Sequence, residues 1–600
     1  MPSRRDVVHY AIRPHDLALH LFEVVLTVAR PDPEGQVLSL PAWIPGSYMI
    51  REFARNIVQI RAESEGRKVK LTKLDKHSWR AARCKGQLTI TYQVYAWDLS
   101  VRAAHLDQTH GFFNGTSVFL QVHGKQQLAH VVDIQPPPGE TYSSWRVATS
   151  LPELKARRYR FGTYQAKDYD ELIDHPVEMG EYILIDFEAH GVPHEMAITG
   201  RIPNLDADRL ANDLQRICEH QIAFFEPRSK RAPMQRYVFL TLAVGDGYGG
   251  LEHRSSTALI CARSDLPVRG QTAITEGYRN FLGLCGHEYF HTWNVKRIKP
   301  AVFAPYDLTR ENYTSLLWLF EGFTSYYDDL TLVRAGVIDR TTYLGLLAKT
   351  LNAVQKGSGR LKQSVAESSF DAWTKYYRQD ENAPNAIVSY YQKGSLVALL
   401  FDLLIRSQTR GKRSLDDVMR ALWRRYGRDF YHDGHGAGVS SVDVEALFDE
   451  VTGLRLKSVF DHAVRGTKDL PLAEALASFA IHYQDRPARA APSLGVRTRR
   501  EGADCKLASV YEGGAAHHAG LSAGDTLVAI DDLRVTASNL DSLLARYRVG
   551  DTVQIHAFRR DELMSFAVSL LPDTSPKISL TMLEKPLAAT KLRDAWLKAR

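Results

Sequence analysis

The chain has 600 residues, of which 44% are hydrophobic and 24% charged, and its formal net charge is +7. This length predicts about three or four domains, and the composition is that of an ordinary globular protein. The basic residues are spread along the chain. Short basic runs such as Arg228–Arg231 and Arg497–Arg500 are not interleaved with aromatic residues, so no nucleic-acid-binding face is expected.

The N-terminus and the cysteines indicate where the protein works. The basic residues near Met1 are not followed by an apolar segment, so a signal peptide is not expected, and no run of about 18 apolar residues predicts a membrane span. The five cysteines are scattered and contain no C-x-x-C pair, which is typical of reduced thiols. We therefore expect a cytoplasmic protein without a membrane partner.

Residues 1–180 are expected to form an antiparallel β domain. Alternating apolar residues and close-set turns predict strands at Leu17–Val28, Val37–Leu40, Gln87–Tyr95 and Ser117–Val122. Leu40–Asn56 and Gly111–Ser117 are dense in aromatic residues and glycine. They fit turns anchored by packed aromatic side chains better than a direct role in a site. The acidic stretch Asp168–Gly180 is interpreted as a connector at the end of this domain.

Residues 181–484 are expected to form a second, mainly helical domain. It begins with strands at Tyr182–His190, Glu195–Gly200, Tyr237–Val244 and Thr257–Cys261. Helical spacing of apolar residues follows at Asp206–Phe225, Tyr313–Gly336, Thr341–Lys356, Lys393–Ser407, Ser414–Tyr426 and Val442–Thr452. Gly245–His253 is predicted to be a loop after the buried strand that precedes it.

The C-terminal part begins after a linker rich in proline, alanine and arginine, Asp485–Pro492. Residues 485–575 contain short strands and one helix, Asn539–Tyr547, and residues 576–600 form a tail with one more helix at Ala588–Lys598. The predicted fold class is therefore multidomain α+β.

A candidate metal-binding motif lies in Gly286–Lys299, which contains H-E-x-x-H from His287 to His291. On a helix, residues four apart lie on one face, so both imidazoles can reach one ion. Glu288 then points toward the place of a water bound to that ion. Zinc in hydrolases uses such neutral nitrogen ligands, an open position and a carboxylate. A helix with two incidental histidines is the alternative, so a third ligand is needed.

Glu321 is the candidate third ligand. It lies 30 positions after His291, in the otherwise apolar helical stretch Leu316–Tyr327. A carboxylate on an apolar helix face is costly unless it is paired or bound to a metal. A nearby arginine or lysine is the alternative partner.

Two further segments carry candidate groups. Gly249 and Gly250 let the backbone of the G-G-L-E-H loop approach a ligand closely, and Glu252 follows them. A polar turn explains this loop equally well. Tyr391 stands at the start of a helix, where a phenol can donate a hydrogen bond to an oxyanion, although by itself it fits a packing role better.

Together these motifs resemble the gluzincin aminopeptidases, and above all their glycyl aminopeptidase family. The resemblance covers about residues 5–600 and rests on Trp43–Asn56, F-F-N-G-T-S, G-G-L-E-H, H-E-Y-F-H-T-W-N-V-K-R-I-K-P, E-N-Y-T-S-L-L-W-L-F-E-G-F-T-S-Y-Y and Y-x-K-G. The larger aminopeptidase family has G-A-M-E-N where this chain has G-G-L-E-H, and a shorter gap between the H-E-x-x-H helix and the ligand glutamate. Both departures favour the glycyl family.

The resemblance implies a thermolysin-like catalytic domain and a role for each matching residue. His287, His291 and Glu321 would bind one Zn²⁺ per chain, and Glu288 would be the general base. Tyr391 would stabilise the oxyanion. Glu252, with Gly249 and Gly250, would hold the α-ammonium group of a peptide with a free N-terminus. The family prefers N-terminal glycine or alanine.

The C-terminal domain resembles PDZ domains of bacterial type. Leu494, Gly495 and Val496 match the carboxylate-binding loop, and Gly513–Val535 is the strongest local match. Asp531-Asp532 departs from the Asn-Gly that is common at this turn. The resemblance leaves two roles open: binding a peptide C-terminus in trans, or packing against a segment of the same chain.

Three functions remain in competition at this point. The first is a zinc aminopeptidase. The second is a peptide-binding scaffold that uses the PDZ-like groove and has a vestigial peptidase site, although the intact motif argues against it. The third is a zinc endopeptidase, which differs in accepting substrates with a blocked N-terminus.

Overall fold

The computed structural model describes residues 7–432, 436–485, 491–585 and 587–598. The chain divides into two compact units. The first comprises Met1–Asn312, Ala335–Val337 and Leu422–Val439, and the second comprises Tyr313–Arg334, Ile338–Ala421 and Ser440–Arg600. None of the helices described is long and apolar enough to cross a membrane.

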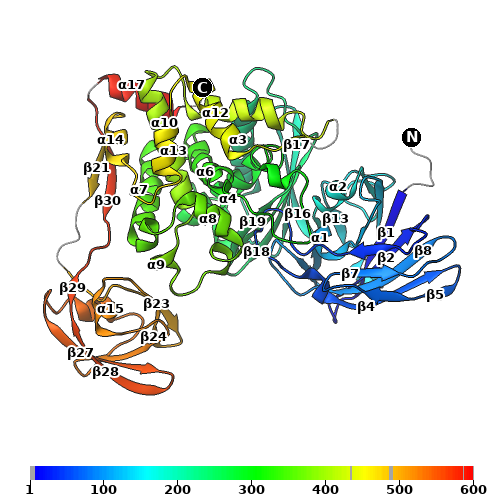
Figure 1. The fold of residues 1–600 in the computed structure, drawn as a ribbon, viewed down its shortest axis with the longest axis horizontal. Helices are drawn as coiled ribbons and strands as arrows, with labels where there is room; N and C mark the ends of the chain where they lie inside the picture. The colour runs from blue at the N-terminus through cyan, green and yellow to red at the C-terminus, as the bar shows by residue number, and fades with distance from the viewer. Residues whose placement is uncertain (1–6, 433–435, 486–490, 586, 599–600) are drawn as a thin grey trace. The chain divides into compact units, whose positions relative to one another are not determined.

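The first unit opens with a seven-stranded sheet in the order β14-β12-β1-β2-β8-β4-β5, much of it visible in blue in Figure 1. The strands are β1 (Val7–Asp16), β2 (Leu21–Val28), β4 (Ile57–Ser64), β5 (Arg67–Val69), β8 (Leu88–Tyr95), β12 (Ala129–Ile134) and β14 (Gly162–Ala166). The β1–β12 pair is parallel and its neighbours are antiparallel. Every second residue of β2 is buried, as its alternating sequence predicts.

Two four-stranded sheets complete the N-terminal β domain, in the orders β13-β15-β10-β9 and β11-β3-β7-β6. Their strands are β3 (Val37–Ser39), β6 (Leu71–Lys73), β7 (Ser78–Ala81), β9 (Ala104–Leu106), β10 (His110–Phe113), β11 (Gln121–Val122), β13 (Arg146–Ala148) and β15 (Val177–Gly180). The expected β-rich domain is thus confirmed.

Three predictions for this region were wrong in detail. Leu17–Val28 begins with a turn, and its strand starts only at Leu21. Ser117–Val122 begins in the one-turn helix α1 (Gly115–Val118), because Ser117 bonds back to the Asn114 carbonyl and so favours a helical turn. Asp168–Gly180 is not a connector: it forms helix α2 (Tyr169–Ile173), which Asp168 caps, and then β15.

A five-stranded sheet follows in the same unit, in the order β16-β17-β18-β20-β19. Its strands are β16 (Tyr182–Ala189), β17 (Val192–Thr199), β18 (Tyr237–Val244), β19 (Tyr248–Glu252) and β20 (Ser256–Ala262). The predicted loop Gly245–His253 is therefore largely an edge strand, because β19 pairs antiparallel with β20 despite its two glycines. Local propensity disfavoured the strand, and tertiary pairing formed it.

Helices α3 (Ala207–Phe225) and α4 (Glu276–Phe290) accompany this sheet. Thr275 caps α4 by accepting a hydrogen bond from the Tyr278 amide. The Tyr289 hydroxyl lies 2.8 Å from Nε2 of His194 on β17, and Gln221 of α3 donates to the Gly286 carbonyl at 2.8 Å. These contacts fix the rotation of α4 about its axis.

The second unit contains the helical part of the middle domain. Its main helices are α5 (Leu317–Phe320), α6 (Gly322–Arg334), α7 (Arg340–Lys356), α8 (Val365–Phe370), α10 (Gln392–Gln408), α12 (Ser441–Thr452), α13 (Lys457–Ala463) and α14 (Leu472–Ala477). Helix α11 (Leu415–Leu422) continues as a π-helical turn at Trp423–Gly427. The predicted mainly helical character is confirmed.

The tail is anchored within the second unit. Helix α17 (Leu587–Leu597) bears Trp596, whose indole donates to the Tyr326 hydroxyl at 2.8 Å. Arg334 donates to the Trp596 carbonyl at 2.9 and 3.0 Å and forms a buried ion pair with Asp416 at 3.2 Å. The expected tail helix is thus present, and it is held by a buried polar network.

The C-terminal β domain has its own hydrophobic core. Its sheet runs in the order β23-β24-β25-β27-β28, with β23 (Val496–Glu501), β24 (Asp504–Val510), β25 (Thr526–Ile530), β27 (Thr552–Arg559) and β28 (Glu562–Ser569). Figure 1 shows α15 (Ala515–Ala519) beside these strands, and α16 (Leu540–Leu544) lies within the predicted Asn539–Tyr547. Asp531 and Asp532 both adopt positive φ, the conformation for which Asn-Gly is the commoner choice. Most of the predicted linker Asp485–Pro492 lies outside the described residues.

Candidate metal centre

His287 and His291 lie at the C-terminal end of α4, in the first unit. Their Nε2 atoms are 3.1 Å apart, close to the roughly 3.3 Å that two zinc–nitrogen bonds at a tetrahedral angle span. Nδ1 of His291 lies 2.8 Å from the Asn294 carbonyl, which can only accept a hydrogen bond. Nδ1 therefore carries the proton and Nε2 offers a lone pair toward His287, as in protein metal sites.

Two carboxylates accompany these histidines in the same unit. Ligand atoms of Glu252, Glu288 and His291 all lie within 4.8 Å of one another, and both glutamates are buried. A Cβ added at Gly250 would lie 2.5 Å from Cδ of Glu288, so only glycine fits there. A Cβ at Gly249 would meet Ile260 at 3.5 Å, which is an ordinary contact. The two glycines that the sequence treats alike are thus distinguished by their surroundings.

Gly46 is a contact of this site that the sequence analysis did not identify. It has φ +94°, and a Cβ there would lie 2.5 and 2.7 Å from the carboxylate oxygens of Glu252. Its segment is a turn anchored by a packed aromatic residue, as predicted, because Trp43 is fully buried and donates to the Asp307 carbonyl at 2.8 Å. The same turn also lies directly against Glu252. The sequence feature that could have identified Gly46 is the motif W-I-P-G-S-Y, in which a glycine lies among aromatic residues.

Behind Glu252, a buried charged cluster connects two loops. Asp174 lies 2.7 Å from the Lys296 ammonium, 2.9 Å from Nε of Arg254 and 3.1 Å from Nδ1 of His253. Burial by itself would raise the pKa of Asp174, but Lys296, Arg254 and the His253 hydrogen bond hold it well below its usual range. The ionised carboxylate thus ties the loop after α4 to the residues that follow Glu252.

A buried lysine extends this cluster. Lys299 lies 4.4 Å from the ring centre of Tyr306 and 5.0 Å from that of Phe430. Burial lowers its pKa to about 8. The basic run K-R-I-K after the H-E-x-x-H motif is therefore buried inside this unit. The sequence analysis assigned no role to these residues.

Glu321 and Tyr391 lie in the second unit. Glu321 is buried at the junction of α5 and α6, so the predicted continuous helix Leu316–Tyr327 is divided there. Gly322 lies against Gly394 of α10, where a Cβ on either would come within 2.6–2.9 Å of the partner's backbone. This close helix crossing brings Tyr390 toward Glu321, whose charge adds to burial in raising the pKa of that phenol well above its usual value.

Tyr391 precedes α10 and is held among other tyrosines. Its ring stacks on Tyr390 at 4.8 Å and on Tyr376 at 5.6 Å, and its hydroxyl lies 3.4 Å from that of Tyr377. Such packing limits the orientations open to the phenol. The structure therefore confirms the packing of Tyr391 that the sequence favoured.

The PDZ-like loop stands at the start of the edge strand β23. Gly495 has φ +68°, and its Cα packs against Gly514. The carbonyls of Leu494 and Gly495 accept hydrogen bonds from Ala516 and Tyr511, both at 2.9 Å. Strand β23 pairs with β24 on one side only among the described strands. This arrangement suits addition of a peptide strand at the outer edge.

Within the second unit, the turn after β24 also contacts the helical part. The Glu512 carboxylate lies 2.6 Å from the Lys362 ammonium and 2.7 Å from the Ser358 hydroxyl. Asn385 exchanges hydrogen bonds with the backbone of Glu512 and Val510, at 3.0 and 2.8 Å.

Comparison with known proteins adds three family matches. Residues 9–181 match the Peptidase M61 N-terminal domain, residues 280–397 the M61 glycyl aminopeptidase, and residues 492–570 a PDZ domain. No curated protein sequence matches the chain.

Among solved structures, an aminopeptidase N family protein from Idiomarina loihiensis is 42% identical, with a TM-score of 0.93 over 98% of this chain and 100% of that one. An M1 zinc metallopeptidase from Deinococcus radiodurans is 13% identical, with a TM-score of 0.48 over 78% of this chain and 95% of that one. The second likeness is too low to support an inference.

Proposed function

The chain belongs to the M61 glycyl aminopeptidase family and is a metallo-aminopeptidase, and we propose that it releases single residues from peptides with a free N-terminus, preferring glycine or alanine. The observation that carries this proposal is the position of Glu252, whose carboxylate lies within 4.8 Å of ligand atoms of Glu288 and His291. A buried carboxylate here attracts the substrate's α-ammonium group and holds the first peptide bond beside the catalytic groups.

One Zn²⁺ per chain is the cofactor in this proposal, held by His287, His291 and Glu321. The 3.1 Å separation of the two Nε2 atoms and the Asn294 contact to His291 support the histidine pair. Burial of Glu321 in an apolar helix segment, within the motif E-G-F, supports the third ligand. When bound, zinc supplies Lewis acidity at the scissile carbonyl and eases deprotonation of the attacking water.

The chain's own residues supply the remaining chemistry. Glu288 accepts the proton of the attacking water and delivers it to the leaving amine. The Tyr391 hydroxyl donates a hydrogen bond to the oxyanion that develops at the substrate carbonyl. The backbone at Gly249 and Gly250 forms the side of the substrate site next to Glu252.

Gly46 supports the preference for a small first residue. Its segment lies against the carboxylate that would bind the α-ammonium group, so little space remains around the substrate's first Cα. In this proposal the same segment stops a peptide chain from extending beyond its N-terminus, which would favour an aminopeptidase over an endopeptidase.

The PDZ-like domain has a separate role in this proposal. Its edge strand and the loop Leu494–Gly495–Val496 accept a peptide C-terminus or a segment of the same chain. For the protein's location we propose the cytoplasm, which the five free cysteines support.

The proposal is tested with purified protein on matched peptides. A glycine- or alanine-terminated peptide should be cleaved after its first residue, and the same peptide with an acetylated N-terminus should not. Metal analysis should find zinc, and a chelator should abolish cleavage. Cleavage of the acetylated peptide at an internal bond would replace the aminopeptidase by an endopeptidase.

Glu252→Gln isolates the amine-binding role. The variant should raise KM for free peptides at least about tenfold, because a neutral amide attracts an ammonium group less strongly, while zinc content stays unchanged. Glu276→Gln, an exposed position on α4, is the control. If KM stayed the same in both variants, Glu252 would have no part in binding the amine.

A further inference from the structure

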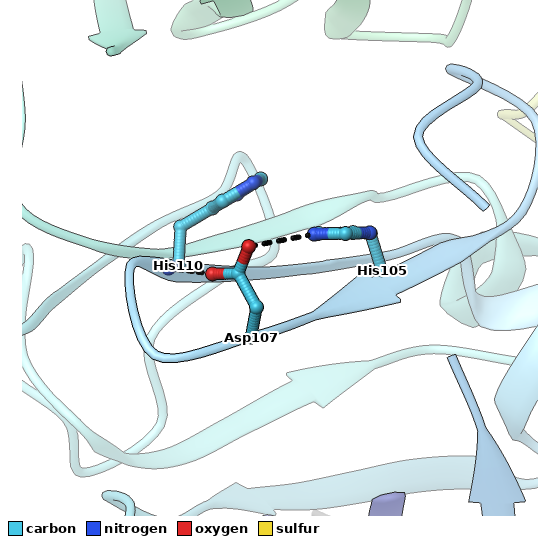
Figure 2. Close-up of side chains that lie close together, drawn as sticks. All are labelled: His105, Asp107 and His110. Atoms are coloured by element: carbon cyan, nitrogen blue, oxygen red, sulfur yellow. Dashed lines mark hydrogen bonds and ion pairs between the residues drawn. The ribbon is translucent and has the colours of Figure 1, made fainter. Parts of the chain in front are cut away.

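A second cluster of potential metal ligands lies in the β9–β10 hairpin, away from the residues assigned above. Ligand atoms of His105, Asp107 and His110 all lie within 4.8 Å of one another. Figure 2 shows the three side chains converging over the hairpin turn. Both histidines are buried, with 2% and 4% of their surface exposed.

We propose that His105, Asp107 and His110 bind a divalent transition-metal ion, with Glu178 orienting His110. The site is structural and adds to the ion proposed at α4. Two imidazoles and one carboxylate are the donors that Zn²⁺ and its neighbours in the first transition series prefer, whereas Mg²⁺ and Ca²⁺ favour sites made of oxygen alone.

Asp107 divides its two oxygens between the turn and the cluster. Oδ1 accepts hydrogen bonds from the Thr109 amide at 2.6 Å and the His110 amide at 3.1 Å. Oδ2 lies 3.2 Å from Nε2 of His105. The turn therefore fixes the carboxylate and leaves its second oxygen directed at the histidine.

His110 is oriented by a second carboxylate. Its Nδ1 lies 3.0 Å from Oε1 of Glu178, and the same oxygen accepts a hydrogen bond from Thr199 at 2.8 Å. Because an ionised carboxylate only accepts, Nδ1 carries the proton, and Nε2 is the atom left for a metal. A carboxylate behind the histidine is the usual outer contact of metal-binding imidazoles.

His105 is a buried ring with one polar contact. Its Nε2 contacts Asp107, and Nδ1 has no hydrogen-bond partner among the described residues. Because Asp107 accepts, Nε2 carries the proton in the metal-free ring, and a bound ion would replace that proton at Nε2.

Space for an ion exists beside this cluster. A small cavity of about 20 Å³ is lined by His105, His110 and Glu178, and residues 99–101, Phe112 and parts of β18 and β20 form the rest of its wall. Asp107 is not among its lining residues. That volume is enough for one water molecule or one ion. To reach bonds of about 2.0–2.2 Å, the side chains would close further around the ion.

The position of the cluster indicates its role. Strand β10 pairs with β15 so that Phe112 lies opposite Glu178, and Glu178 contacts Thr199 at the end of β17. An ion here would therefore join the hairpin of the N-terminal β domain to the five-stranded sheet of the same unit. Its expected effect is on stability rather than on the chemical step.

The decisive experiment is a crystal of the full chain measured on both sides of the zinc absorption edge, after exposure to Zn²⁺. The proposal predicts an anomalous peak among His105, Asp107 and His110. The peak should also be present when the zinc-loaded protein is dialysed for a long time against metal-free buffer before it is crystallised. Absence of that peak, or its loss on dialysis alone, would overturn the proposal. This measurement uses the unaltered chain, so it does not depend on the folding of any variant.

Metal content of variants provides a second readout. The unaltered chain should hold about two zinc ions, and His105→Gln and His110→Gln about one each. The matched control is His130→Gln, a buried histidine of the same β domain whose Nε2 also lacks a partner among the described residues; it should retain both ions. Equal zinc content in all four proteins would contradict the proposal.

Thermal unfolding separates ligation from a purely structural histidine. Added Zn²⁺ should raise the unfolding temperature of Glu321→Ala, in which only the hairpin site would remain. The same addition should leave the double variant Glu321→Ala/His105→Gln unchanged. An equal rise in both proteins would show that the stabilisation does not come from His105.

Discussion

The two histidine clusters of the first unit use the same ligand types on different scaffolds. On α4, the Nε2 atoms of His287 and His291 face each other at 3.1 Å. In the β9–β10 hairpin, each histidine instead contacts a carboxylate oxygen: Nε2 of His105 lies 3.2 Å from Asp107, and Nδ1 of His110 lies 3.0 Å from Glu178. In the two proposals, the helical cluster would offer its lone pairs to one shared catalytic ion, whereas the hairpin cluster, whose histidines contact carboxylates, would hold a structural ion.

The largest expected effect concerns the chemical role of the helical cluster. Glu288→Gln keeps the shape of the side chain but removes the base, so kcat should fall about 10³-fold while zinc content stays the same. Glu276→Gln on the same helix should leave kcat unchanged. If Glu288→Gln retained full kcat, the helical cluster would be no more catalytic than the hairpin cluster.

The next effect concerns the buried charged cluster around Asp174. Asp174→Asn leaves Lys296 buried without its counter-charge and removes one of the carboxylates paired with Arg254, so the free energy of unfolding should fall by about 3 kcal/mol in urea denaturation. Asp170→Asn removes a more exposed partner of Arg254, with 25% of its side chain accessible, and should cost below about 1 kcal/mol. Equal losses would mean that the charged cluster does not depend on Asp174.

A steric test follows from the glycines beside Glu288. Gly250→Ala forces a methyl group against the Glu288 carboxylate and should lower kcat about 10²-fold without loss of zinc. Gly249→Ala has room for its methyl group and should change kcat/KM less than about threefold. The reverse order of the two variants would contradict the geometry described for β19.

The smallest effect lies in the hairpin and depends on pH. Burial opposes ionisation of Asp107, but hydrogen bonds from Thr109, His110 and His105 outweigh it and lower its pKa to about 2. A carboxylate with a depressed folded-state pKa stabilises the protein above its unfolded value near 3.8, and this stabilisation is lost as the pH falls toward 2. Asp107→Asn should therefore cost about 1 kcal/mol at pH 6, because asparagine still caps the turn.

Urea unfolding of both proteins in metal-free buffer at pH 6, 4 and 3 measures this difference. The gap between the unaltered chain and Asp107→Asn should narrow as the pH falls. A gap that stayed constant with pH would show that the charge of Asp107 contributes nothing to the hairpin.

Sequence periodicity identified the elements whose apolar pattern is regular. The continuous apolar run Tyr237–Val244 is strand β18 with the predicted bounds, and Thr341–Lys356 differs from α7 by one residue. Strand β19 was missed because its glycines disfavour a strand until β20 supplies the backbone partner. Residues 168–180 were misjudged because their acidic composition resembles a solvated linker, whereas Asp174 is neutralised by residues about 80 and 120 positions away.

By itself, the sequence determined which residues carry the proposed chemistry, because the spacing of His287, Glu288 and His291 on a helix follows from local geometry. Tertiary structure alone decided which groups surround them. Gly46 reaches Glu252, and Asp174 reaches Lys296, only after distant segments pack together. The hairpin cluster has the same origin, since Glu178 meets His110 through strand pairing across 68 positions. Helical spacing can be read from a sequence, but a partner brought by sheet pairing or loop packing can be found only in the folded chain.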